Sequence, residues 1–270
     1  MSASVPTQLI RYESGVPFKP REDALAAEEP LEIRVEGNSI AVVMRTPGHD
    51  RELAAGFLLS EGIIKSAKQV FEITTCMAKD DPGRGNAVDV ALSQPSSFDV
   101  SKFSRHVVTT SSCGICGSVS IETVLHRQAR IKETWKIEAE TLLKLPAKLL
   151  RRQETFHSTG GLHACALFDC QGRYIAHRED IGRHNALDKL IGWALLAKKT
   201  PLRKHVVLLS GRASFEMMQK AHAAGIAVVA AISAPSSLAV EFARASGQTL
   251  AGFVRGSSMN LYAGAQRIAK

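Results

Sequence analysis

A chain of 270 residues with 45% hydrophobic residues can form one large domain or two small ones, with a core that needs no disulfide. No stretch reaches the roughly 20 apolar residues of a membrane span, so we expect a soluble, cytoplasmic protein without membrane contact. The net charge of +8 would suit a nucleic-acid partner, but aromatic residues make up only 6% and basic residues are scattered among acidic ones. A pocket for a small phosphate-bearing ligand explains the charge better than a nucleic-acid partner does, and a merely solvated basic surface explains it as well as that pocket does.

The N-terminal third predicts a small α+β unit behind an unstructured start. Residues 1–25 are polar and lack periodicity, which is typical of disorder. Asp50 is a suitable N-cap for a helix over residues 52–64. Four strands are predicted by alternating or continuous apolar residues, at 31–35, 40–44, 70–75 and 87–92.

Two cysteines, Cys113 and Cys116, follow in a glycine-flanked loop between an apolar run at 107–108 and a helix-like segment from about Ser118. Glycines permit positive φ and leave the sulfur atoms accessible. The start of a helix directs free N–H groups and the positive dipole end at the thiolates, which lowers their pKa. The loop therefore predicts reactive sulfur chemistry.

Three other interpretations of this cysteine pair are weaker. The first 20 residues contain no apolar signal segment, and five cysteines cannot all pair, which disfavours a structural disulfide. A zinc site needs four ligands, and no second C-x-x-C exists because Cys165 and Cys170 are too far apart. A thioredoxin-like pair would follow the first strand of a compact domain, whereas about a hundred residues precede this one.

The C-terminal half predicts an α/β layered domain with a mostly parallel sheet. Its apolar runs are nearly unbroken, as expected for parallel strands that helices cover on both faces. Helices are predicted at 119–130, 138–153 (interrupted by Pro146), 185–197, 215–224 and 237–245. Strands are predicted at 162–168, 173–177, 205–209, 226–232 and 249–254, the first two as a hairpin.

Polar loops follow three of these strands, at 210–214, 233–237 and 255–258. Each combines serine hydroxyls with backbone N–H groups, and two add an arginine, which suits phosphate. A single such loop is more often an ordinary helix cap, but carboxyl ends of parallel strands meet at one edge, which favours a shared site.

A fourth candidate is the segment 179–186, in which a strand ends in two carboxylates and the next helix starts with Arg183 and His184. Cationic residues oppose the dipole at a helix start, so an anionic ligand is one explanation. An N-cap by Asp180 or Gly182 with a solvated ion pair is the other.

Six motifs in this order resemble one family, the formate dehydrogenase accessory sulfurtransferases FdhD, over about residues 30–265. They are 45–50 (RTPGHD), 113–117 (CGICG), 159–163 (TGGLH), 179–189 (EDIGRHNALDK), 210–214 (SGRAS) and 252–255 (GFVR). The resemblance implies a small α+β subdomain over 26–117, ending in the cysteine loop, and a cytidine-deaminase-like α/β domain over 118–270.

The resemblance also implies a sulfur carrier with sulfurtransferase activity through a cysteine persulfide. A cysteine desulfurase would load Cys113, with Cys116 as its partner, and the sulfur would pass to the molybdenum bis-guanine-dinucleotide cofactor destined for formate dehydrogenase. The implied cofactor-binding residues are Phe253, Val254, Arg255, Gly256, Ser257 and Ser258, and the phosphate-suited loop adds Ser210, Gly211 and Arg212. No permanent metal is implied, and a homodimer is common for such proteins.

Two rival functions remain. A zinc deaminase needs an H-x-E motif upstream of P-C-x-x-C, yet Ser112 precedes Cys113 and the H-x-E at 177–179 comes after the pair. A cofactor chaperone without sulfur chemistry differs from the carrier only in a cysteine-dependent assay.

Overall fold

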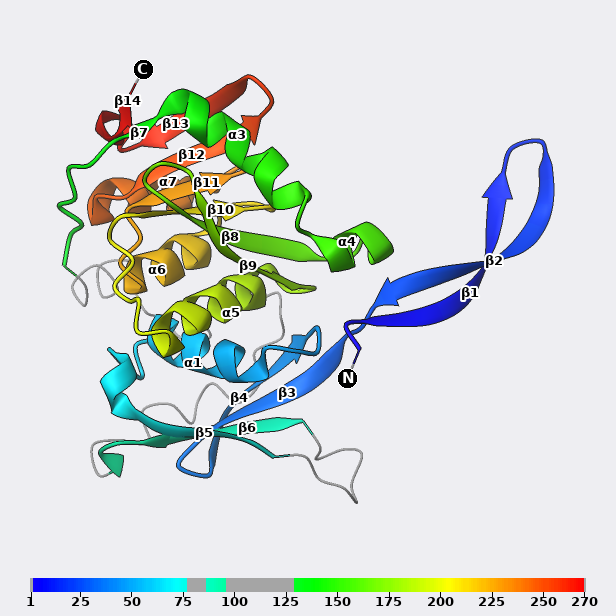
Figure 1. Ribbon diagram of the computed structural model, residues 1–270, viewed down its shortest axis with the longest axis horizontal. Helices are drawn as coiled ribbons and strands as arrows, with labels where there is room; N and C mark the ends of the chain where they lie inside the picture. Colours follow the sequence, from blue (N-terminus) through cyan, green and yellow to red (C-terminus); the bar gives the residue numbers. More distant parts are fainter. Residues whose placement is uncertain (1, 77–85, 96–128, 270) are drawn as a thin grey trace.

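The computed structural model describes residues 2–76, 86–95 and 129–269, so the loop of Cys113 and Cys116 lies outside the described residues. Two sheets form the body, with α-helices between them (Figure 1). No helix in these described ranges is both long and apolar enough to cross a membrane.

Residues 4–26 form a hairpin, so the prediction of disorder there is wrong. Strands β1 (Ser4–Glu13) and β2 (Val16–Ala26) pair antiparallel and project from the body (Figure 1). The rings of Tyr12 and Phe18 lie 5.6 Å apart, and both side chains are exposed. The backbone ladder and this cross-strand contact hold the hairpin, whereas burial against the body, which would show as hydrophobic periodicity, contributes little.

The four predicted N-terminal strands are confirmed as one sheet in the order β4-β3-β6-β5. Their bounds are Glu29–Val35 (β3), Asn38–Arg45 (β4), Val70–Cys76 (β5) and Ala87–Leu92 (β6), and a short 3-10 helix, η1 (Ala67–Gln69), precedes β5. Helix α1 (Asp50–Ser60) covers one face of this sheet.

Asp50 does not cap α1, contrary to the prediction. His49, with φ of 59°, is the N-cap residue, and Asp50 is the first helical residue. The Asp50 carboxylate instead accepts hydrogen bonds from Nε and Nη2 of Arg45, at 2.9 and 3.0 Å. The Arg45 side chain is only 1% exposed, and a buried guanidinium needs a carboxylate partner more than a helix needs a cap.

The second sheet has six strands in the order β13-β12-β11-β10-β8-β9. The strands are His163–Asp169 (β8), Tyr174–Asp180 (β9), His205–Leu209 (β10), Val228–Ala231 (β11), Thr249–Arg255 (β12) and Ser258–Ala263 (β13). Only the pairs β10/β11 and β11/β12 are parallel, so the sheet is mixed and the prediction of a mostly parallel sheet is wrong. Helical crossovers join β10, β11 and β12, whereas tight turns at β8–β9 and β12–β13 force antiparallel pairing.

Helices cover both faces of the six-stranded sheet (Figure 1). Helix α3 (Ala139–Leu150) packs on one face, and α5 (Arg183–Leu196), α6 (Phe215–Ala223) and α7 (Ser237–Ser246) pack on the other. Shorter elements are α4 (Glu154–Thr159), the 3-10 helix η5 (Ala265–Arg267) and the paired strands β7 (Ile137–Glu138) and β14 (Ile268–Ala269).

Pro146 lies inside α3 without ending it, so the predicted interruption is wrong. A proline in a helix interior costs about 3 kcal/mol. Leu142, Leu145 and Leu149 are fully buried on one face of this helix, and each contributes roughly 1.5–3 kcal/mol. Burial on both sides of the proline therefore outweighs its cost.

The two sheets share one hydrophobic core, because α1 packs directly on α5. Glycines permit this contact: a Cβ at Gly56 would lie 1.8 Å from the Asp188 carbonyl oxygen, and one at Gly192 would lie 1.8 Å from that of Glu52. The backbones of the two helices therefore touch, and neither position tolerates a side chain.

Buried charges reinforce this contact. Lys189 and Asp180 form an ion pair at 2.7 Å, with side chains 1% and 0% exposed. Thr46 joins the pair from the N-terminal half: its N–H donates to Asp180, and its carbonyl accepts from Lys189 Nζ at 2.7 Å. The motifs 45–50 and 179–189 thus meet in a single network.

A second buried network lies beside the first one. Lys220 Nζ contacts Ser60 Oγ, Glu61 Oε1 and Asp188 Oδ2, each at 2.9 Å, and Ser60 Oγ donates to Asp188 Oδ1 at 2.8 Å. Burial opposes the charge of Lys220, but Asp188 and Glu61 outweigh it and raise the pKa of the ammonium.

Candidate functional site

The loops that follow β10, β11 and β12 lie side by side at one edge of the six-stranded sheet. Ala213 pairs with Pro235 in a parallel bridge: the Ala213 N–H donates to the Ala234 carbonyl at 3.2 Å, and the Ser236 N–H donates to the Ala213 carbonyl at 3.0 Å. The Phe253 N–H donates to the Ser233 carbonyl at 3.1 Å. The predicted gathering of these loops is therefore confirmed.

The third loop is the turn of the β12–β13 hairpin. Phe253 has a φ of 52°, a left-handed value that is uncommon for a bulky residue, and the strand pairing is irregular there. The Arg255 guanidinium stands 5.6 Å from the Phe253 ring centre, and Arg255 Nε donates to the Ile232 carbonyl at 3.0 Å. Arg255, Gly256, Ser257 and Ser258 are exposed.

Val254 differs from its neighbours because its side chain is completely buried in the core. Only its backbone can face a ligand. The other residues of the implied cofactor stretch, 253 and 255–258, are at least partly accessible.

The first loop contacts the beginning of β8. The Ala164 N–H donates to Ser210 Oγ, and the Ser210 N–H donates to the Ala164 carbonyl, both at 2.9 Å. A Cβ at Gly211 would lie 3.2 Å from His163 Nδ1, so the loop backbone runs against the imidazole ring. Arg212 is exposed.

The second loop includes an ordinary helix cap. Ser236 Oγ accepts a hydrogen bond from the Ala239 N–H at 3.2 Å at the start of α7. Gly182 and Ser214, the N-cap residues of α5 and α6, make no such side-chain bond. Gly182 is nevertheless the N-cap residue of α5, as one sequence interpretation had it, and of these three helices α7 has a side-chain cap bond.

The two carboxylates at the end of β9 are structural. Glu179 accepts from the Phe156 N–H at 2.9 Å and the Thr155 N–H at 3.3 Å, which caps α4. Asp180 accepts from Thr46, Gly182 and Asn185 in addition to pairing with Lys189. Asp180 thus holds the turn into α5, but its ion pair is buried and not solvated as the sequence interpretation had it.

Arg183 and His184, at the start of α5, are the residues of this motif that are still candidates for ligand binding. Arg183 Nε is buried and has no hydrogen-bond partner among the described residues. His184 Nε2 lies 4.0 Å from a Glu216 carboxylate oxygen. Burial and the nearby charges of Lys220 and Arg183 lower the pKa of His184 to about 4, so its ring is neutral near pH 7.

Sequence reasoning did not single out His163 as a site residue. It begins β8, which runs antiparallel to β10, so its first residue lies at the carboxyl end of β10. The polar residues 157–163, which lead into β8, could have indicated a site here, but the direction of β8 in the sheet was needed to interpret them.

The residues of the rival H-x-E motif have separate partners. His177 Nδ1 lies 2.7 Å from the Tyr174 hydroxyl, and Arg178 pairs with Glu52. Within the described residues no group of three or more His, Cys, Asp or Glu side chains is placed to hold a metal. The expectation of no resident metal stays a prediction, because Cys113 and Cys116 are outside those residues.

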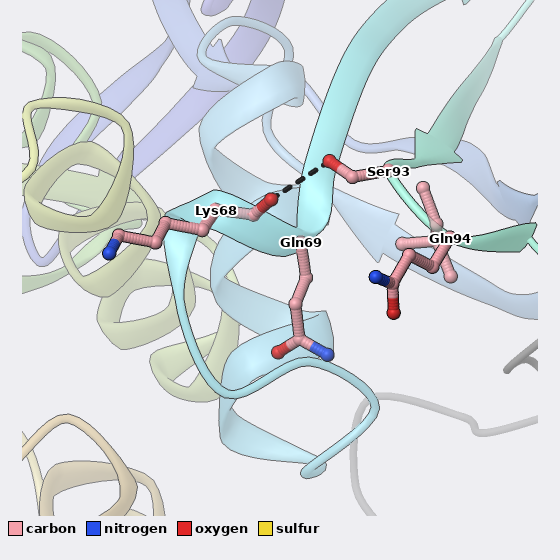
Figure 2. Close-up of a pocket in the computed structure, with 5 residues that line it drawn as sticks. Lys68, Gln69, Ser93 and Gln94 are labelled. Atoms are coloured by element: carbon pink, nitrogen blue, oxygen red, sulfur yellow. Dashed lines mark hydrogen bonds between the residues drawn. The ribbon is translucent and has the colours of Figure 1, made fainter.

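A separate cavity of about 260 Å³ lies at the four-stranded sheet (Figure 2). Its lining comes from η1 and the end of β6, and Ser93 Oγ donates to the Lys68 carbonyl across it at 2.8 Å. The lining residues are Lys68, Gln69, Leu92, Ser93 and Gln94. With one charged residue and no residue from the loops 210–214, 233–237 and 255–258, this cavity is not the predicted phosphate site.

Comparisons with known proteins agree with the motif resemblance. The model of the FdhD/NarQ family matches residues 26–269. Proteins named sulfur carrier protein FdhD are 49% identical in Nocardia farcinica, covering 92% of this chain and 89% of that one, and 48% identical in Streptomyces avermitilis, covering 97% and 94%.

One solved structure has the same fold. It is provisionally described as a formate dehydrogenase accessory protein from Desulfotalea psychrophila, with a TM-score of 0.78 and 24% identity, and the match covers 99% of this chain and 100% of that one. The specific cytidine-deaminase-like layering stays a prediction.

Proposed function

Because the chain belongs to the FdhD/NarQ family, we propose that it is a sulfur carrier that serves the maturation of a formate dehydrogenase. In this proposal a cysteine desulfurase supplies the sulfur, and the molybdenum bis-guanine-dinucleotide cofactor is the substrate that receives it. The observation that carries the proposal is the near 50% identity to sulfur carrier proteins over more than nine tenths of the chain. We place its action in the cytoplasm, as a homodimer.

The sulfur chemistry requires only the two loop cysteines. The Cys113 thiolate attacks the outer sulfur of the desulfurase persulfide, the S–S bond breaks, and the desulfurase thiolate leaves. Cys116 can then attack the inner sulfur of the Cys113 persulfide, which forms a Cys113–Cys116 disulfide and releases hydrosulfide. The two thiols supply the two electrons, and a cellular dithiol restores them.

The strand-end loops supply the contacts that a guanine dinucleotide needs. Its diphosphate groups require cations and N–H donors, and the edge offers Arg212 and Arg255 with the backbones of 210–214 and 255–258. The Phe253 ring, partly accessible beside Arg255, can stack on a flat base. Binding and orienting this substrate is the role that we assign to the edge.

Persulfide loading tests the sulfur step. After incubation with a cysteine desulfurase and cysteine, intact-protein mass should rise by one sulfur in the wild type and in Cys116→Ala, but not in Cys113→Ala. Cys116→Ala should nevertheless mature formate dehydrogenase poorly in cells. A Cys113→Ala variant that gains sulfur and supports maturation would refute the assignment, and maturation without any cysteine dependence would favour a chaperone.

Calorimetry with guanosine diphosphate tests the binding step. Arg255→Ala should weaken binding about tenfold or more, because a charge-assisted contact to phosphate contributes roughly 1.5–3 kcal/mol. Arg244→Ala, on the exposed side of α7, is the matched control and should bind as the wild type does. Equal affinity in the Arg255→Ala variant would remove this residue from the site.

A further inference from the structure

We propose that His163, Arg183 and Arg212 form an anion site for a diphosphate group, at the β8–β10 end of the edge and separate from the β12–β13 turn. This site would give the guanine-dinucleotide substrate a second point of contact. The inference rests on the proposed function only for the identity of the ligand that carries the diphosphate. Of the three residues, Arg212 belongs to the cofactor site expected from the sequence, Arg183 to the separate candidate segment 179–186, and His163 to neither.

The geometry of the site follows from strand pairing. His163 pairs with Asp180 across β8 and β9, and Cys165 pairs with Leu209 across β8 and β10. His163 therefore lies between the turn into α5 and the loop into α6. Because Gly211 has no Cβ, the loop backbone approaches the His163 ring, at a place where a Cβ would be 3.2 Å from Nδ1.

Two guanidinium groups act on this histidine. Burial lowers the pKa of His163, the positive charges of Arg183 and Arg212 lower it further, and the Asp180 carboxylate opposes them. The neutral ring keeps one N–H to donate. Arg183 Nε is buried without a hydrogen-bond partner among the described residues, which is costly unless a ligand accepts from it.

The neighbouring carboxylates do not cancel these charges. Asp180 is fully buried and is already paired with Lys189 and three N–H donors. Glu216 faces both His184 and Arg183 and can offset one of the two arginines. Lys220 is neutralised by Asp188 and Glu61. Of the two positive charges on Arg183 and Arg212, one is therefore not neutralised by a neighbouring carboxylate.

A diphosphate fits this arrangement better than a single carboxylate. Arginine forks bind phosphate oxygens in pairs, and α5 and α6 both start at this place without a side-chain cap. Strands β8 and β12 are three strand spacings apart, about 14 Å. The phosphate held here is therefore not the one beside Arg255, and an extended ligand can reach both.

Calorimetry with inorganic pyrophosphate at fixed pH and low ionic strength tests the site. Arg183→Gln should weaken binding at least tenfold, and Gly211→Ala several-fold because its methyl group displaces His163. Arg183→Lys should recover part of the affinity, and Arg244→Gln, at an exposed position of α7 outside both proposed sites, should change it less than twofold. Unfolding temperatures close to that of the wild type would establish that the variants fold.

Two results would overturn the inference: an unchanged affinity in folded Arg183→Gln, or an equal loss in Arg244→Gln. Persulfide loading, measured on the same preparations, tests the proposed sulfur-carrier function independently of the anion site. If the wild type fails to load sulfur and the Arg183→Gln variant loses its affinity for pyrophosphate, the anion site stands and the sulfur-carrier function fails. If the wild type loads sulfur normally and the variant binds pyrophosphate as the wild type does, the anion site fails and the sulfur-carrier function stands.

Discussion

Two groups of charged residues differ in burial and in pairing. In the joint between α1 and α5, Asp180 and Lys189 are almost completely buried, and each has a partner within 3 Å. At the edge of the sheet, Arg212 and Arg255 are exposed, and Arg183 Nε has no partner among the described residues. Within the motif 179–189, the inward residues Asp180 and Lys189 therefore hold the two halves together, whereas Arg183 is a residue that we propose to bind a ligand.

The largest expected effect is on the joint. Asp180→Ala leaves the Lys189 ammonium buried without a carboxylate, which should lower the free energy of unfolding by about 3–5 kcal/mol. Urea unfolding measures it. The double variant Asp180→Leu with Lys189→Met should recover much of the loss, because no buried charge is left. A loss below about 1 kcal/mol in the single variant would mean that the pair is not buried in solution.

The helix contact in the same joint comes next. Gly56→Ala places a methyl group 1.8 Å from the Asp188 carbonyl oxygen, so the helices must separate. We expect a loss of about 1–3 kcal/mol or more in urea unfolding. Arg51→Ala, at an exposed position of the same helix, is the control and should stay within about 0.5 kcal/mol. Equal stability of the two variants would contradict the direct backbone contact.

The joint should also show in the pH dependence of stability. Burial raises the pKa of Glu52, but hydrogen bonds and charges from Arg178 and His49 outweigh burial and lower it from 4.5 to about 2. The contribution of Glu52 is therefore fully present above pH 4.5 and is lost as the pH falls from 4.5 toward 2.

Glu52→Gln tests this titration. The variant should be on the order of 1–3 kcal/mol less stable than the wild type at pH 7. The difference should shrink below pH 4.5 and nearly vanish at pH 2, as measured by urea unfolding across the range. A difference that is constant with pH would show that Glu52 does not titrate with a lowered pKa.

The smallest expected effect is at the edge. Arg255 is exposed, and its truncation removes one hydrogen bond to the Ile232 carbonyl, so Arg255→Ala should change unfolding by about 1 kcal/mol or less. The same variant should lose most of its affinity for guanosine diphosphate. If stability fell as far as in Asp180→Ala, the contrast between the two regions would not hold.

The sequence predicted the buried elements well and the exposed ones poorly. Apolar runs such as those of β10 and β11 record burial on both faces of a sheet, and both strands were found where expected. The hairpin β1–β2 and strand β13 carry no such record, because most of their residues are exposed. Strands that are held mainly by backbone hydrogen bonds show little of the alternation between apolar and polar residues by which a strand is recognised in the sequence.

The candidate site was predicted in part for a related reason. Loops at the ends of β10, β11 and β12 follow from strand direction, so their gathering could be foreseen. The inward turn of Asp180 could not be foreseen, because its partner Thr46 is 134 residues away. His163 was overlooked because its place depends on the direction of β8.

The contact between α1 and α5 has a consequence during synthesis of the chain. Helix α1 emerges from the ribosome about 120 residues before α5 begins, which at roughly 5–20 residues per second is a delay of about 6–25 s. Throughout that time the face of α1 that carries Gly56 has no helix to pack on. We therefore expect the N-terminal half to need protection by chaperones until α5 arrives, and truncated chains that end before residue 183 to be degraded rather than to accumulate.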